Sequence, residues 1–290
     1  VGYGVQKKSD VTGAMARVGE KELKAMPVRN ALEGMQGKTA GVDITSSQRP
    51  GEVGNINIRG QRSINAEQGP LYVVDGMVIQ NGGIENINPS DIESIDILKD
   101  ASATAIYGSR GANGVILVTT KKGKEGKVTL NYSGTVTFET LHDVTKMMSA
   151  SEWLDYARLA KYNAGSYASA TPTYEADKAA FGSVTSSWQN IEKAWVNGVY
   201  DPSLVGSYDW TSHGKQTGIT HEHTLSASGG SDKFQGYASF GYLDQKGTQP
   251  GQAYERYTLK TSFDVTPVDW FKMGSSINAS YSCLLYTSDA

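Results

Sequence analysis

The sequence has a single cysteine, no long apolar run and no excess of basic residues, and each shortage excludes a class of protein. Cys283 has no partner for an internal disulfide, which excludes a disulfide scaffold. No stretch of about 18 consecutive apolar residues occurs, so a membrane-spanning helix is excluded on length. The formal net charge is -3, and without a cationic excess no nucleic-acid partner is expected.

Patterns that carry catalysis or metal binding are also missing. Of the four histidines, His221 and His223 are spaced to share one face of a strand, but no third ligand lies at a useful spacing. The glycine runs that begin at Gly51 and Gly108 lack the lysine and the strand–loop–helix setting of a phosphate loop. We therefore expect no enzyme activity, no cofactor and no metal site.

Glycine and tyrosine are abundant instead, with 33 and 16 residues. This pairing favours β structure, in which glycines form tight turns and aromatic rings lie at a wet boundary. The opening Val1-Gly2-Tyr3-Gly4 lacks the basic start and the apolar stretch of a signal peptide. The protein is accordingly either cytosolic or missing its true start.

The second half of the chain alternates apolar and polar residues. Alternation with period two predicts strands whose two faces meet different surroundings. The segments are Val128–Phe138, the poorer His223–Gly229, Phe234–Tyr242, Tyr257–Val265 and Phe271–Tyr281. Most approach ten residues, the length of a tilted membrane-crossing strand, against about 5–6 for a soluble one. We predict five antiparallel strands.

Connections between these strands differ in length. Residues 229–233 and 267–269 are tight turns, whereas the link at about 139–220 is very long. Short turns at one rim and long loops at the other are typical of outer-membrane barrels, although a soluble sandwich can show them too. Five strands cannot close a membrane barrel, so we predict a partial barrel, and residues 283–290 read as a doubtful tail without a closing pattern.

The long link contains one predicted helix. Ser149 and Glu152 form a capping-box pattern before a helix that runs through Leu159. The aromatic side chains that follow suit either sugar stacking or contacts of a long loop with the barrel rim, and we favour the rim. These aromatics are Tyr167, Tyr174, Trp188, Trp195, Tyr200, Tyr208 and Trp210.

The first half of the chain mixes short helix and strand signals. Leu71-Tyr72-Val73-Val74-Asp75-Gly76 is a buried strand that runs into an Asp-Gly hairpin turn. Residues 91–97 alternate like a strand, and 101–107 read as a short helix that ends at Gly108. Residues 121–127 are basic and contain glycine, which suits a linker and equally an ordinary surface turn.

The order of several motifs resembles the plug signature of the SusC/RagA family of TonB-dependent outer-membrane transporters. The hairpin is followed by Asn88-Pro89-Ser90-Asp91-Ile92-Glu93, then Lys99-Asp100-Ala101, then Tyr107-Gly108-Ser109-Arg110-Gly111-Ala112-Asn113-Gly114. The likeness extends upstream to 32–42 and Ile58-Arg59-Gly60, and downstream to 225–231, 241–247 and 255–257. Each glycine alone fits any compact α+β domain, so the specificity lies in the combined order and spacing.

This resemblance implies a fold and a function. The fold is an α+β plug domain at 1–122, a linker at 123–127 and, at 128–282, about five strands of a membrane β-barrel with 22 expected strands. The implied function is TonB-dependent import of a glycan oligosaccharide or peptide across the outer membrane, with a SusD-like surface lipoprotein as partner. Family members contact TonB through a box just before the Val-Gly-Tyr-Gly motif, and Val1–Gly4 is that motif.

Four plug charges are candidates for ion pairs with the polar lumen of the barrel, although each also suits solvated surface. They are Arg59, Lys99, Asp100 and Arg110. An alternative to transport is a soluble or surface-attached β-rich binding or adhesion module that uses the aromatic segment. A continuous lipid-facing band would favour the transporter, and a two-sided soluble core would favour the module.

Overall fold

The computed structural model describes residues 15–23, 28–60, 69–79, 84–100, 104–142 and 146–286. The chain divides into two compact units, of which the first joins Val1–Thr140 to Gln216–Ala290 and the second is Leu141–Lys215. The Val1–Gly4 motif lies outside the described residues.

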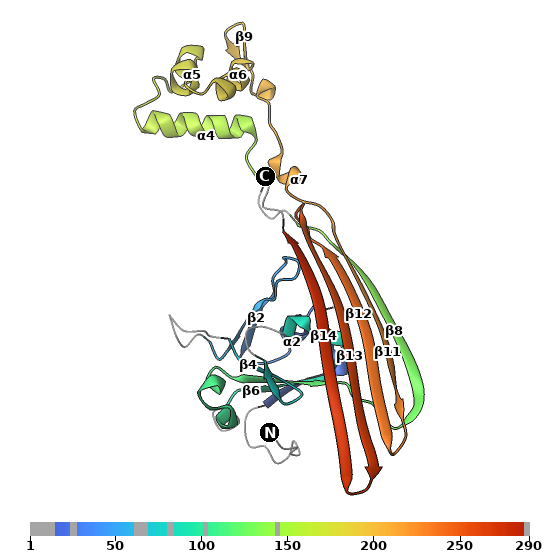
Figure 1. The fold of residues 1–290 in the computed structure, drawn as a ribbon. Coiled ribbons are helices and arrows are strands. Elements are labelled where there is room, and N and C mark those ends of the chain that lie inside the picture. Colours follow the sequence, from blue (N-terminus) through green and yellow to red (C-terminus); the bar gives the residue numbers. More distant parts are fainter. Residues whose placement is uncertain are drawn as a thin grey trace. The chain divides into compact units, whose positions relative to one another are not determined.

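Five long strands form one antiparallel sheet in the first unit. They are β8 (Gly126–Glu139), β11 (Gly218–Gly230), β12 (Phe234–Lys246), β13 (Gln252–Val268) and β14 (Phe271–Tyr286). Their order in the sheet is β14-β13-β12-β11-β8, so each strand lies beside its neighbour in the chain (Figure 1). The prediction of five antiparallel strands is confirmed, and each strand extends beyond its predicted segment.

The two faces of this long-stranded sheet differ in chemistry. Apolar side chains occupy one face and are exposed, among them Leu130, Phe240 and Leu259 at 73%, 51% and 50%. Polar and charged side chains such as Arg256, Thr258 and Lys260 occupy the other face and are buried. We call these the outer face and the inner face. The arrangement is inverted relative to a soluble β protein, which exposes its polar face.

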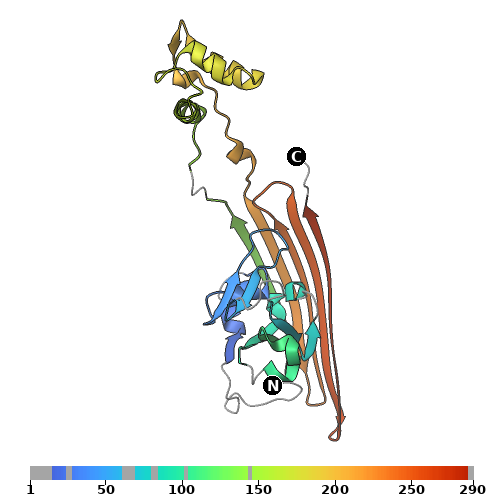
Figure 2. The ribbon, with the colours of Figure 1, turned by 90° about the vertical axis from the view of Figure 1, so that its left-hand side faces the viewer.

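The N-terminal domain, residues 15–122, lies against the inner face (Figures 1 and 2). Its main sheet has the order β1-β6-β7-β4-β5. The strands are β1 (Met15–Gly19), β4 (Leu71–Val74), β5 (Met77–Ile79), β6 (Ile92–Leu98) and β7 (Val115–Thr120). β4 and β7 are parallel, and the other pairs are antiparallel. The described part of the domain also contains the hairpin β2 (Val42–Thr45) and β3 (Asn55–Ile58), the helices α1 (Glu20–Leu23) and α2 (Ala31–Met35), and the short 3-10 helices η2 (Ile84–Asn86), η3 (Pro89–Asp91) and η4 (Ala105–Gly111).

Aliphatic side chains form the core of this domain. Ile92, Ile95 and Ile97 of β6 are fully buried, as are Ala31 and Met35 of α2. β-branched residues suit this position because they fit a pleated sheet with little loss of rotamer freedom. The predicted hairpin is confirmed: β4 and β5 pair across Asp75 and Gly76, whose φ angles of 49° and 87° suit a type I′ turn.

The helix predicted at 101–107 is confirmed where the structure describes it, since Thr104 is α-helical and its amide donates to the Asp100 carbonyl at 3.0 Å. The structure has a 3-10 helix, η4, at Ala105–Gly111, and residues 101–103 lie outside the described residues. The predicted end at Gly108 is also confirmed, because its φ of 61° and ψ of −147° are not helical and separate two helical turns within η4. A positive φ costs glycine little, so the chain can end one turn here and begin the next in another direction.

The second unit is helical rather than an open loop. It contains α4 (Ala150–Asn163), α5 (Tyr174–Phe181), α6 (Thr185–Glu192), a hairpin of β9 (Trp195–Val196) and β10 (Val199–Tyr200), the 3-10 helix η5 (Pro202–Leu204) and α7 (Trp210–His213). The predicted cap is confirmed, since Ser149 and Glu152 form both hydrogen bonds of a capping box. The aromatic side chains build the unit's own core, in which Tyr167 and Trp188 pack with Leu154 and Ile191. We call this unit the insert.

No helix within the described ranges is long and apolar enough to cross a membrane.

Candidate functional site

The interface between the N-terminal domain and the inner face is the candidate site, because buried polar and charged groups meet there. Buried polar groups are costly unless they are paired, so their partners show how the domain is held. The contacts fall into three groups along the sheet.

The first group centres on Lys260 in the middle of β13, which is only 2% exposed. Its ammonium donates a hydrogen bond to the Thr120 hydroxyl and lies 3.7 Å from Oδ2 of Asp75. Thr120 ends β7 and Asp75 directly follows β4. Because β4 and β7 run parallel, their carboxyl ends meet at one edge and present both acceptors together.

The second group joins the Asn88–Asp91 turn to β11 and β12. The Tyr237 hydroxyl donates to Oδ1 of Asp91 at 2.7 Å, and the Asn88 amide donates to the Thr224 hydroxyl at 2.9 Å. Gly241 permits this approach, since a Cβ there would lie 2.3 Å from Nδ2 of Asn88. Within the motif, Asn88 also caps the 3-10 helix η3 (Pro89–Asp91) by accepting from the Ser90 amide.

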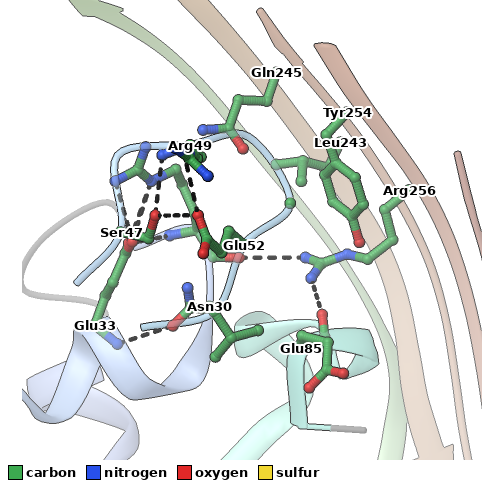
Figure 3. Close-up of a pocket in the computed structure, with 13 residues that line it drawn as sticks. Asn30, Glu33, Ser47, Arg49, Glu52, Glu85, Leu243, Gln245, Tyr254 and Arg256 are labelled. Carbon is green, nitrogen blue, oxygen red and sulfur yellow. Dashed lines mark hydrogen bonds and ion pairs between the residues drawn. The ribbon is translucent and has the colours of Figure 1, made fainter. Parts of the chain in front are cut away.

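The third group surrounds a small hollow between the domain and strands β12 and β13 (Figure 3). Arg256 points from β13 into the domain and donates to the carbonyl oxygens of Glu85 and Arg29. Arg29 pairs in turn with Glu33 at 3.1 Å and with Glu139, the last residue of β8, at 3.2 Å. A chain of charges therefore runs from β13 through the domain to β8.

The outer face ends in a line of aromatic rings. Tyr242, Tyr257 and Tyr281 stand in register on β12, β13 and β14, with ring centroids 5.0 and 6.5 Å apart. On the neighbouring strands, the Tyr132 hydroxyl and Nδ1 of His223 are hydrogen bonded at 2.8 Å. Beyond this line, the next register row contains the carboxylates Asp244 and Glu255, so the apolar band stops there.

For three of the four predicted lumen charges, the structure shows contacts within the N-terminal domain, and their pairing with a barrel lumen stays a prediction. Arg59 pairs with Asp100, and Lys99 donates to the Ala40 carbonyl, so these contacts stay within the N-terminal domain. Burial, with the charge of Arg59, lowers the pKa of Lys99. Arg110 is exposed on η4.

The signature motif supplies different contacts from those four charges. Asp75, Asn88 and Asp91 reach the strands, whereas Gly114, with a φ of 95°, packs against Ile58. Ala101 lies outside the described residues. Sequence reasoning missed the strand-side partners Lys260, Arg256 and Tyr237. The sequence did contain a signal for these three residues, because each lies among the polar positions of an alternating strand. A large polar or charged side chain at such a position is uncommon and indicates a contact with another part of the protein.

Among the residues that the structure describes, no group of three His, Cys, Asp or Glu is arranged to hold a metal ion.

Comparisons with known proteins agree with this geometry. Residues 7–115 match the family model described as TonB-dependent Receptor Plug Domain. The chain is 38% identical over 269 residues to TonB-dependent receptor P39 of Formosa agariphila, covering 91% of this chain. It is 33% identical to TonB-dependent receptor SusC of Bacteroides thetaiotaomicron, covering 90% of this chain.

The fold is also that of a solved structure. The RagAB peptide importer in its open-open state superposes with a TM-score of 0.77 at 31% identity, over 97% of this chain and 32% of that one. The chain spans 23% of the length of P39 and 24% of SusC, about a quarter of the curated relatives it matches.

Proposed function

The chain belongs to the TonB-dependent receptors of the SusC/RagA type, and from this premise we propose that it acts in TonB-coupled import of a bulky nutrient across the outer membrane. In this proposal the N-terminal domain is the plug, assigned to residues 1–122, and 128–282 are barrel strands after a linker at 123–127. β8 already begins at Gly126, and β14 extends through Tyr286, into the segment read as a tail.

The inverted sheet carries the proposal. From Phe271 to Tyr281, β14 advances ten residue steps, or about 34 Å at ~3.4 Å per step. At a tilt of about 40° this is roughly 26 Å of height, close to the ~25 Å apolar band of outer-membrane barrels. Aromatic rings close the upper end of the band, as they do at a membrane interface. A soluble binding or adhesion module would leave this band in water, where a patch of such size favours aggregation.

The plug contacts suit closure that can be reversed. They are hydrogen bonds and ion pairs to a polar wall rather than a continuous apolar core. Such contacts can be exchanged for contacts with water when the plug moves, so release costs less than opening a hydrophobic core.

Cargo and partners follow from the relatives. The importer RagAB is described as importing peptides, which supports a peptide, and a glycan oligosaccharide is the other class that we propose for this type of receptor. A SusD-like surface lipoprotein would cover the outer opening, and TonB would pull on the N-terminal end. The relatives are named as receptors and importers rather than enzymes, in agreement with an import role.

Uptake by the organism that encodes the chain tests the proposal. A strain without the receptor gene and a strain without TonB are each supplied with a mixed pool of casein peptides or of starch and other plant oligosaccharides. We expect both strains to leave in the medium the same subset of compounds that the parent strain removes. A receptor mutant that depletes both pools like its parent would contradict import of these two cargo classes.

A further inference from the structure

Lys260 is the most deeply buried cation of the interface, and its burial needs an explanation. It is 2% exposed at mid-strand, and moving an ammonium out of water is costly unless an opposite charge and hydrogen bonds replace the lost hydration. Asp75 and Thr120 supply both. This contact therefore joins β13 to the ends of β4 and β7, which are distant from β13 in the sequence.

The acceptor side of this contact is held in place by hydrogen bonds within the N-terminal domain. Asp75 accepts from the Thr120 backbone amide at 2.9 Å and from the Thr120 hydroxyl, and its own amide donates to Val118 at 3.0 Å. The left-handed φ of 49° at Asp75 belongs to the turn that holds the carboxylate there. The Asp-Gly pair of the signature motif thus does more than form a turn, because it also holds the Asp75 carboxylate against the inner face of the long strands.

We propose that Lys260, on the inner face of β13, holds the β4/β7 edge of the plug in its closed position through Asp75 and Thr120. We call this contact the latch. This inference rests on the proposed function only in giving the N-terminal domain the role of a plug; the contact itself is independent of transport.

A second ion pair across the same interface provides a matched control. Arg29 and Glu139 are joined at 3.2 Å, but their side chains are 21% and 29% exposed. Water and salt screen such a pair, so its loss should matter little. The pair of Lys260 and Asp75 is less exposed, at 2% and 15%, so the loss of Lys260 leaves the largely shielded Asp75 carboxylate without its counter-ion, the more damaging change.

Access of a reagent to the plug core tests the latch. In the full-length receptor, in outer-membrane vesicles, every native cysteine, Cys283 among them, is replaced by serine, and Val73→Cys on β4 then places a single reporter where the side chain is 2% exposed. The rate of alkylation by a water-soluble maleimide is measured in a fixed, sub-denaturing concentration of urea.

We expect Lys260→Met and Asp75→Asn each to raise the alkylation rate at least tenfold, and Glu139→Gln less than threefold. The double variant Lys260→Met with Asp75→Asn should react no faster than the faster single variant, because both changes remove one interaction. Unchanged rates for the single variants, or fully additive effects in the double variant, would overturn the latch.

Two controls keep the outcome clear. The heat-modifiable gel shift of barrel proteins reports whether each variant barrel has assembled. Should Lys260→Met not assemble, the Asp75→Asn comparison decides alone, since it alters the plug and leaves the wall sequence intact. The assay contains no cargo and no TonB, so a failed uptake experiment and a failed latch are distinguishable.

Discussion

At the scale of single residues, polar contacts between the plug and the wall require close approach, and Gly241 provides it. A Cβ at this position would lie 2.3 Å from Nδ2 of Asn88 and 2.4 Å from Oγ1 of Thr258. Gly241→Ala should therefore displace Asn88 and leave its amide without Thr224, a loss of about 1–3 kcal/mol for a buried donor.

The same alkylation assay measures this effect as faster labelling of the plug reporter. Gly236→Ala on the same strand is the control, because Gly236 lies on the outer face and a Cβ there meets only the Phe234 ring, at 3.3 Å. Equal labelling rates for the two variants would show that Gly241 has no special role in seating the plug.

In the insert, the buried polar contacts centre on Asp177. It is fully buried and accepts from Arg158 at 2.9 Å, from Tyr167 at 2.7 Å and from the Trp195 indole at 3.0 Å. Asp177→Asn should destabilise the insert by about 3–5 kcal/mol, as expected when one member of a buried ion pair is lost. Asp155→Asn is the matched control, since Asp155 pairs with the same arginine but is 61% exposed, and should cost less than about 1 kcal/mol.

Limited trypsin digestion of the receptor distinguishes these two variants, because unfolding of the insert releases the helical backbone at Lys161 of α4 and Lys178 of α5 for cleavage. Rapid cleavage of Asp177→Asn with slow cleavage of Asp155→Asn is the expected result. Similar digestion of both variants would mean that burial does not decide the strength of the pair.

The insert should also lose stability in alkaline solution. Burial, together with the hydrogen bond to Asp177, raises the pKa of Tyr167 from 10.0 to about 12. The folded form therefore favours the protonated phenol, and its contribution is complete below pH 10 and is lost as the pH rises toward about 12. Tyr167→Phe should remove this loss, which near-ultraviolet circular dichroism of wild type and variant would detect. Identical alkaline transitions would contradict the assignment to Tyr167.

Residue roles were the least predictable feature of the sequence. Arg59, Lys99, Asp100 and Arg110 stood out as charges within the motif, yet Arg59 pairs with Asp100 within the plug. Asp75 and Asp91, which contact the long strands, were recognised in the sequence only as members of the signature motif. A sequence shows which charges exist, whereas pairing depends on which strand ends meet in space, and that requires the topology.

At the scale of elements, the edge position of β1 suggests how the plug opens. Among the described strands, β1 pairs with β6 alone, over five residue pairs, whereas β4 and β7 lie deeper in the sheet. In the proposed import role, a pull on the N-terminal end would reach β1 first of these strands, and an edge strand can separate without disturbing the pair behind it. Opening should therefore begin between β1 and β6.

Cross-linking tests this order. Arg17→Cys with Asp96→Cys joins opposite residues of β1 and β6, and Val73→Cys with Leu117→Cys joins β4 to β7. Facing residues in neighbouring strands are close enough for a disulfide. We expect the first disulfide to stop uptake until it is reduced and the second to change uptake less than twofold. Full uptake with the β1–β6 disulfide in place would contradict the proposed order.

Strands were predicted better than helices in this chain. Period-two alternation identified all five long strands because their two faces meet different surroundings. In the insert, only the α4 cap at Ser149 was predicted, although Thr173 also caps α5; α5 and α6 are eight residues each and gain their stability from the aromatic core. Short helices that depend on tertiary contacts leave little local signal.

At the scale of the whole molecule, one arrangement unites the sequence and the structure. Long strands present an apolar outer face that ends in a line of tyrosines, and a separate α+β plug covers their polar inner face. The family resemblance predicted both parts, and the comparisons with P39, SusC and RagAB confirm them. The cargo could not be predicted, because no described contact of the plug or the strands selects one nutrient.

The most direct test of this account is to determine which face of β14 meets lipid. Single cysteines from 271 to 281 in the full-length receptor are spin-labelled in bilayers, and their collisions with oxygen and with a water-soluble nickel complex are compared. The account predicts a period of two, with Met273, Ile277 and Tyr281 reached by oxygen from the lipid and Ser276, Asn278 and Ser280 shielded from it. Equal exposure of both sets to the nickel complex, without alternation, would contradict a membrane-spanning sheet.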